Sequence, residues 1–287
     1  MFTVFTDSSA NLTEGLIRQY GLSVISLHYT LDGAEYESHQ TGATFSPERF
    51  YNALRQKAEA GTSLAGTGAY LDAFSPLLEA GCDILYIGLS SGVSGTVQAT
   101  RLAADELAET FPDRTVVVID SLTGGMAQGL LACEAAKLRQ QGCSLSETAE
   151  KISRMRENAN IYFTVDDMFH LKRGGRLSGA AAVISTVLSI KPIMSPGMDG
   201  KIALREKIRG RKASIERLAR LFAERCLPAA QTVGINHGDC AEDAEYLARL
   251  VRQSGKVKNI IINYLDPVLG VHAGPGALTI AFMGAER

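Results

Sequence analysis

Tryptophan is absent from this chain of 287 residues, and paired cysteines are absent as well. The five cysteines are scattered and form no Cys-x-x-Cys pair, which excludes a disulfide framework and favours a reduced, cytoplasmic setting. No two of the five histidines lie at metal-ligand spacing on one predicted helix. We therefore expect a core without disulfides, no metal site and no cofactor.

The sequence also lacks strong net charge and long apolar runs. A formal net charge of −2 provides no positive field for nucleic acid, so we expect no nucleic-acid partner. The first residues have no basic start, and no apolar run is long enough for a membrane span, so we expect no signal peptide and no stable membrane insertion. Hydrophobic residues make up 46% of the chain, enough for a large core, and the length suits two domains.

Short apolar runs alternate with amphipathic segments in the first half of the chain. A hydroxyl followed by proline at Ser46-Pro47-Glu48 predicts a helix start, and Asn11 or Thr13 caps an earlier helix. This alternation predicts a mostly parallel sheet flanked by helices. The predicted strands cover 2–5, 22–29, 83–89 and 115–119, and the predicted helices cover 11–20, 46–60, 69–80, 95–110, 126–140 and 145–157.

The second half begins differently, with a hairpin around the turn Pro196-Gly197-Met198-Asp199-Gly200. We therefore predict an α/β fold of two α/β domains, covering residues 1–157 and 158–287, the second with a mixed sheet. No Pro- or Ser-rich linker marks the boundary. The predicted strands cover 161–165, 190–194, 201–208, 232–236, 258–264 and 278–283, and the predicted helices cover 213–226 and 241–253.

Three predicted strands of the first half end in hydroxyl-rich turns, at residues 6–9, 90–96 and 120–125. The carboxyl ends of parallel strands meet at one edge of a sheet, where ligands bind. Hydroxyl groups and the N–H groups of helix starts suit a carboxylate or a phosphate there. The alternative is that these side chains only cap helices. Neither a Walker A motif nor Gly-x-Gly-x-x-Gly occurs, so nothing specific supports a nucleotide.

Three further features each allow two interpretations. Gly88-Leu89-Ser90-Ser91-Gly92 matches the nucleophile turn of serine hydrolases, and Asp266 and His272 follow in the expected order, although the match is short. His272 lies in a predicted glycine-rich turn at 270–276, where a histidine donates to an anion or is a plain loop residue. Basic residues cluster at 172–176 and 201–212, either as a solvated face or as a docking surface for an acidic partner or phosphate.

Taken together, the motifs resemble the DegV family from end to end. The stretches that carry the resemblance are Thr6-Asp7-Ser8-Ser9-Ala10, Thr62-Ser63, residues 88–96, Asp120-Ser121, residues 163–176, Lys191-Pro192-Ile193, Asp199-Gly200-Lys201-Ile202 and His272-Ala273-Gly274-Pro275-Gly276. The resemblance implies a long-chain fatty acid buried between the two domains. It also implies a partner fatty-acid kinase, which makes the acyl phosphate, and thus a lipid carrier that is not itself an enzyme.

The same resemblance implies the roles of individual residues. Thr62, Ser94 and His272 would hold the fatty-acid carboxylate, and Arg209 would face the kinase. One departure affects the first ligand loop, where Leu64-Ala65-Gly66 stands in place of the family's frequent Gln-Pro-Ser. A serine hydrolase is the alternative function, and an anion-binding or regulatory module is a third. Next to the three carboxylate-binding residues, we expect contributions from Ser63, Ser91 and Gly95.

Overall fold

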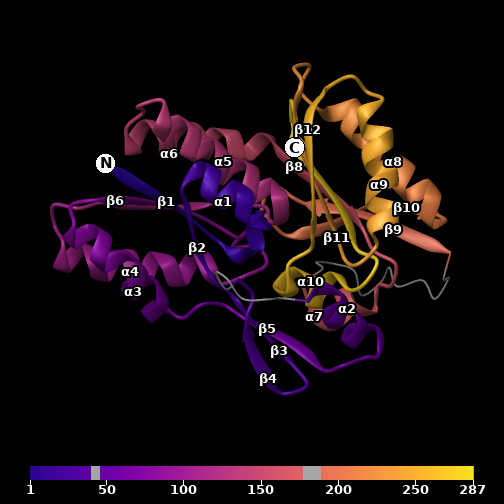
Figure 1. Cartoon of the computed structure of the whole chain (residues 1–287), viewed down its shortest axis with the longest axis horizontal. Helices are drawn as coiled ribbons and strands as arrows, with labels where there is room; N and C mark the ends of the chain where they lie inside the picture. Colours follow the sequence, from indigo (N-terminus) through magenta and orange to yellow (C-terminus); the bar gives the residue numbers. More distant parts are fainter. Residues whose placement is uncertain (40–45, 177–188, 287) are drawn as a thin grey trace.

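The computed structural model describes residues 1–39, 46–176 and 189–286 (Figure 1). Its first sheet has the strand order β2-β1-β6-β7, and all neighbouring strands run parallel. This confirms the parallel sheet predicted for the first half. The strands are β1 (Phe2–Asp7), β2 (Leu22–Ile25), β6 (Asp83–Gly88) and β7 (Val116–Asp120).

Helices cover both faces of this first sheet, because alternate strand residues point to opposite sides. Val4 packs in the core beneath α5 and α6, whereas its neighbour Phe5 packs in the core beneath α3 and α4. Thr13, and not Asn11, caps α1 by accepting from the Leu16 N–H. The helices are α1 (Glu14–Tyr20), α3 (Thr67–Glu79), α4 (Thr96–Thr110), α5 (Gly125–Gln140) and α6 (Leu145–Met155), with 3-10 turns at Ser8–Ala10 and Arg156–Asn158.

The second sheet is mixed, as predicted, with the order β10-β9-β8-β13-β11-β12. Its β11–β12 pair is parallel and its other pairs are antiparallel, including the predicted hairpin of β9 and β10. Helices α8 (Arg211–Arg225) and α9 (Ala241–Arg252) bury one face. The strands are β8 (Ala159–Thr164), β9 (Ile190–Pro196), β10 (Ile202–Arg209), β11 (Gln231–His237), β12 (Val257–Tyr264) and β13 (Leu278–Met283).

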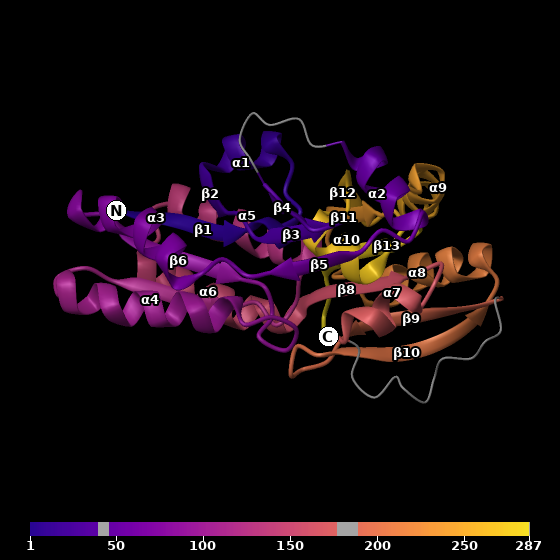
Figure 2. The same cartoon turned by 90° about the horizontal axis from the view of Figure 1, so that it is seen from below.

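Helix α5 packs against both sheets and so joins the two halves, which lie side by side in Figure 2. Its Met126 lies so close to Gly234 of β11 that a Cβ at that glycine would be 2.0 Å from Cγ of Met126. The Met126 N–H also donates to Oδ1 of Asn236, at 3.2 Å. All strands of the first sheet precede residue 158, and all strands of the second sheet follow it. The division into domains at that residue remains a prediction.

A third, small sheet was not predicted. The expected strand at 22–29 divides into β2 and β3, and the expected helix at 46–60 ends at Arg55, so that Ala60 begins a strand. Both corrections have one cause: β3 pairs with β4 and β5 instead of continuing beside β1. The elements of this region are β3 (His28–Leu31), β4 (Ala34–Glu37), α2 (Pro47–Arg55) and β5 (Ala60–Ser63).

One hydrophobic cluster fastens this small sheet to the second half of the chain, and we call it the joining cluster. Tyr29 and Phe50 contribute from the first half, with ring centroids 5.4 Å apart. Phe163 and Leu265 contribute from the second half, and both are buried. Nearby, the Tyr51 hydroxyl donates to the Leu265 carbonyl at 2.7 Å. Burial of this apolar surface stabilises the contact between parts of the chain that are distant in sequence.

Two short helices complete the fold and correct a second prediction. Residues 270–276 are not a loop throughout, because α10 (Pro267–Ala273) extends over His272. Asp266 caps this helix by accepting from the Leu269 N–H at 3.2 Å, and Pro267 occupies its first turn. Helix α7 (Phe169–Gly174) packs against α10.

Candidate functional site

The three hydroxyl-rich turns gather at one edge of the first sheet, as the sequence predicts. The Leu89 N–H donates to the Asp7 carboxylate at 2.9 Å, which joins the first turn to the second. The Ser90 N–H donates to the Thr123 carbonyl at 2.9 Å, which joins the second turn to the third. The turns therefore form one connected edge.

The first of these turns is a buried scaffold. Asp7 is fully buried and accepts from the N–H and hydroxyl of Ser9, from the Tyr86 hydroxyl and from the Leu89 N–H. Burial raises the pKa of the Asp7 carboxyl, although these hydrogen bonds act in the opposite direction. The Ser9 hydroxyl also lies 2.9 Å from Oε1 of Gln128. These groups are occupied with one another and position the neighbouring turn.

An apolar cavity lies beside this edge, between the first sheet's turns and the second sheet. It holds about 680 Å³ of space not filled by atoms, its open side included. Nearly all of its wall is hydrophobic, and His272 and Arg176 bring the titratable groups to it. The main apolar wall residues are Leu89, Val93, Ile161, Phe163, Leu171, Ile202, Leu265 and Leu269.

His272 and Thr62 form a polar pair at this cavity. Nε2 of His272 lies 2.8 Å from Oγ1 of Thr62, a hydrogen bond between α10 and β5. Burial lowers the pKa of His272 to about 4, and the charges of Arg176 and Arg173 act in the same direction. The imidazole is therefore neutral at pH 7. Its Nδ1 is buried and has no hydrogen-bond partner among the described residues.

The turn at 90–96 lies against the loop that carries Thr62. A Cβ at Gly95 would be 3.1 Å from Cδ2 of Leu64, so the two loops are in contact. The Ser94 hydroxyl is half-buried, lies 2.7 Å from the Thr96 hydroxyl and accepts from the Thr96 N–H at 3.3 Å. Thr62 therefore contacts His272 directly. The loop that follows Thr62 contacts the turn that carries Ser94.

Three other predicted residues form no hydrogen bond with the His272–Thr62 pair in the part of the chain that the structure describes. Ser63 and Ser91 are exposed, and the Ser91 N–H donates to Oδ1 of Asp120 at 3.2 Å. Gly95 is exposed and begins α4. The cavity wall includes His272, whereas Thr62, Ser63, Ser91, Ser94 and Gly95 are not part of it.

The residues of the hydrolase alternative do not form a triad. The Ser90 hydroxyl is buried and donates to the Gly200 carbonyl at 2.9 Å. His272 is paired with Thr62, and the Asp266 carboxylate accepts from the Ser38 hydroxyl and caps α10. Neither His272 nor Asp266 is therefore placed to take the proton of Ser90, as serine catalysis requires.

Arg209 lies at the end of β10, with its side chain exposed. Ile202, at the other end of this strand, lines the cavity, which places the two Cα atoms roughly 23 Å apart at a rise of about 3.3 Å per residue. Arg176 lies at the cavity itself. Sequence reasoning singled it out only as part of the basic stretch at 172–176, because such a run has no feature that separates a ligand contact from a solvated face.

In residues 1–39, 46–176 and 189–286, no group of three or more His, Cys, Asp or Glu side chains could hold a metal ion. Within the same ranges, every helix is too short or too polar to cross a membrane.

The fold is that of an α/β protein with an apolar cavity between its two sheets. A family model described as an uncharacterised protein of the DegV family matches residues 1–285. A DegV domain-containing protein of Clostridium perfringens is 36% identical over 287 residues, which cover 100% of this chain and 98% of the relative. The chain belongs to the DegV family.

Solved structures agree with this assignment. The fatty-acid-binding DegV family protein of Thermus thermophilus superposes with a TM-score of 0.87 at 28% identity, covering 98% of this chain and 99% of that one. DegV of Bacillus subtilis, a fatty acid binding protein, superposes with a TM-score of 0.85 at 29% identity, covering 99% of each chain.

Proposed function

We propose that this protein binds one long-chain fatty acid in the apolar cavity. The observation that carries the proposal is the cavity itself, a hydrophobic space with the His272–Thr62 pair at one end. Burying each CH₂ group contributes about 0.8 kcal/mol, so a chain of about 16 carbons gains roughly 10 kcal/mol. Two DegV proteins of similar structure bind fatty acids, which supports the same ligand here.

The carboxylate is held by hydroxyl donors at the polar end. Thr62 accepts from or donates to a neutral imidazole, so the His272 ring orients the hydroxyl without adding charge. Ser94 lies on the turn that contacts the same loop, and Ser63, Ser91 and Gly95 flank it. Arg176 supplies the positive charge at the cavity wall. Such donors offset the several kcal/mol that an unpaired buried carboxylate costs.

The protein presents this carboxylate to a partner fatty-acid kinase, which transfers a phosphoryl group to it and forms the acyl phosphate. In this role the chain is a carrier in the cytoplasm, without a catalytic residue or a cofactor of its own. Arg209 faces the kinase in this arrangement. The family resemblance, together with the exposed position of Arg209 on β10, supports this part of the proposal.

Lipid extraction of the purified protein tests the binding step. Protein purified from a bacterial host is expected to yield about one fatty acid per chain by mass spectrometry, and delipidated protein is expected to rebind added fatty acid. The proposal fails if repeated extraction yields none and added fatty acid does not bind. A fluorophosphonate probe is the parallel test of the hydrolase alternative, and Ser90 is expected to remain unlabelled because its hydroxyl is buried and bonded to Gly200.

A further inference from the structure

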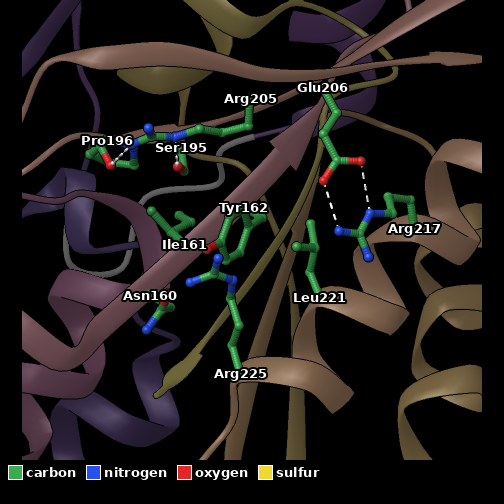
Figure 3. A pocket seen from close by; sticks show the side chains of 10 residues that line it. All are labelled: Asn160, Ile161, Tyr162, Ser195, Pro196, Arg205, Glu206, Arg217, Leu221 and Arg225. Carbon is green, nitrogen blue, oxygen red and sulfur yellow. Dashed lines mark hydrogen bonds and ion pairs between the residues drawn. The ribbon is translucent and has the colours of Figure 1, made fainter. Parts of the chain in front are cut away.

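A second cavity lies on the second sheet, and its lining is polar and basic. Strands β8, β9 and β10 form its floor, and α8 forms its wall (Figure 3). It holds about 580 Å³ of unfilled space, its open side included. We call it the arginine pocket, because three arginines and a single acid line it: Arg205, Arg217, Arg225 and Glu206.

The positive charge of Arg217 is already balanced by carboxylates of the protein. Its guanidinium donates two hydrogen bonds of 2.8 Å to the two carboxylate oxygens of Glu206 (Figure 3). It also donates to both carboxylate oxygens of Glu224, at 2.8 and 3.0 Å. Hydrogen bonding from Arg217 lowers the pKa of Glu206, so the acid stays ionised. One guanidinium thus faces two carboxylates, so the positive charge of the pocket comes from the other two arginines and is offset in part by the second carboxylate.

Arg205 is fixed by neutral acceptors. Its Nε donates to Oγ of Ser195 at 2.7 Å, and one terminal nitrogen donates to the Pro196 carbonyl at 2.9 Å. Neither partner carries charge, so the guanidinium is oriented without being neutralised. A guanidinium has five N–H donors, and these two hydrogen bonds engage only part of them.

Arg225 reaches into the pocket from α8, with its guanidinium beside Tyr162 in Figure 3. Its ion pair with Glu286 is long, at 3.7 Å, and the Glu286 side chain is 80% exposed, so the pair contributes little. Tyr162 is buried, and burial raises the pKa of its phenol. The phenol is therefore protonated at neutral pH and available as a hydrogen-bond donor.

We propose that the arginine pocket binds a phosphate group. Arg205 and Arg225 supply two positive charges from different elements, and the Tyr162 phenol supplies a third donor. A phosphate carries about −1.5 to −2 charges near pH 7, which matches two guanidinium groups, and the planar fork of arginine suits its oxygens.

This site is separate from the His272–Thr62 pair, and it adjoins the apolar cavity. Ile161 and Pro196 line both spaces, so the two cavities are neighbours. The bound phosphate is either inorganic phosphate or the phosphate end of an organic molecule. Arg205 and Arg225 lie outside the apolar cavity, so phosphate binding at this site does not require fatty-acid binding.

Titration calorimetry of the full chain tests the proposal with two probes, inorganic phosphate and methyl phosphate. We expect saturable binding of at least one probe with one site per chain. Arg225→Gln is expected to weaken it at least about tenfold, equivalent to about 1.4 kcal/mol. Tighter binding of methyl phosphate points to a phosphate ester, and equal or tighter binding of inorganic phosphate points to the free ion.

Arg220→Gln is the matched control, because Arg220 is exposed on the same helix and does not line the pocket. It should retain wild-type affinity. Arg225→Lys is a second variant that keeps the charge and loses the planar fork, and it too should bind more weakly. The proposal is overturned if wild-type protein shows no saturable binding of either probe at millimolar concentration. It is also overturned if Arg220→Gln weakens binding as much as Arg225→Gln.

Discussion

A neutral histidine joins α10 to β5 at the polar end of the apolar cavity. Because the pKa of His272 is lowered to about 4, its ring carries one proton at pH 7 and therefore has one donor nitrogen and one acceptor nitrogen. Its Nε2 engages the Thr62 hydroxyl, and its Nδ1 lies close to Gly174, where a Cβ would be 2.3 Å away. A larger residue at Gly174 would therefore displace the imidazole that orients Thr62.

Removal of single hydroxyls is expected to weaken fatty-acid binding. If the carboxylate binds as proposed, Thr62→Ala and Ser94→Ala each remove one donor to it, which costs about 1–3 kcal/mol, or roughly 5- to 150-fold in affinity. Thr62→Ser is the matched control, because it retains the hydroxyl, and it should bind nearly as well as the wild type. Equilibrium binding of a fluorescent fatty acid measures the effect. Unchanged affinity in both alanine variants would place the carboxylate elsewhere.

Asp266 gives the protein a stability that depends on pH. Burial raises the pKa of this carboxyl to about 7, against an ordinary value of 3.8. A raised folded-state pKa contributes stability that is complete below pH 3.8 and is lost as the pH rises through 7. Asp266→Asn mimics the protonated acid, so the variant should gain about 2–3 kcal/mol relative to the wild type between pH 5 and pH 8, at about 1.4 kcal/mol per pH unit.

Urea unfolding at several pH values measures this difference. Asp113→Asn, at an exposed position, reports the general effect of removing one carboxylate. A difference between Asp266→Asn and the wild type that does not change with pH would show that Asp266 is ionised in the folded protein throughout this range.

At the scale of elements, two turns from different sheets meet backbone to backbone. A Cβ at Gly92 would be 2.5 Å from the Gly200 carbonyl carbon, and a Cβ at Gly200 would be 2.1 Å from Oγ of Ser90. The Ser90 hydroxyl donates to the Gly200 carbonyl within this contact. Only glycine fits there, which explains why the turn after β6 and the β9–β10 hairpin are both glycine-rich.

Gly200→Ala is expected to lower stability through both strain and collision. The φ of Gly200 is +72°, and the side chain would strike Ser90. Gly255→Ala is the matched control, because Gly255 has a φ of +70° and no atom within 4 Å of the added Cβ. The control should lose about 1–2 kcal/mol from the left-handed backbone alone, and Gly200→Ala should lose about 2–4 kcal/mol. Equal losses, measured by chemical unfolding, would mean that the turns separate freely.

The strands and helices that the sequence predicted well are those with strong local patterns. The strands β1, β6 and β7 are short apolar runs, and Ser46 caps α2 ahead of Pro47 as its sequence indicates. The small third sheet escaped prediction because Ala34–Glu37 is exposed along its whole length and carries no apolar alternation. Helix α10 was not predicted, because the glycines at 270, 274 and 276 are typical of a loop, although Asp266-Pro267 is a helix start signal.

The candidate site shows a similar division. The meeting of three strand ends followed from the parallel sheet, whereas the pairing of Thr62 with His272 was expected only through the family resemblance. The cavity wall could not be predicted, because residues such as Ile161 and Phe163 have the same apolar pattern as any buried strand. The packing of elements that are distant in sequence decides which buried strand residues line the cavity.

At the scale of the whole molecule, lipid binding and kinase delivery are expected to separate. Arg209→Ala should leave fatty-acid affinity within about threefold, because Arg209 lies at the far end of β10 from the cavity, and should reduce acyl-phosphate formation at least tenfold, about 1.4 kcal/mol. A cognate kinase, ATP and labelled fatty acid provide the assay. Lys207→Ala, exposed on the same strand, is tested alongside as a neighbouring basic residue of the same run.

Arg211→Ala belongs in the same series, because the sequence places several basic residues together. Arg211 is half-buried and donates to Asp243 at 2.8 Å, so its guanidinium is already committed within the fold. Wild-type phosphorylation in all three variants would show that the basic run at 201–212 has no part in delivery.

The joining cluster has a consequence for how the protein is made. Tyr29, Phe50 and Leu54 leave the ribosome about two hundred residues before their partners Leu265 and Val271. Translation proceeds at about 5–20 residues per second, so these aromatic and aliphatic side chains remain without the surface that buries them for roughly 10–40 s. The first half of a nascent chain is therefore expected to be a client of cellular chaperones, and slow translation of the second half should reduce the yield of folded protein.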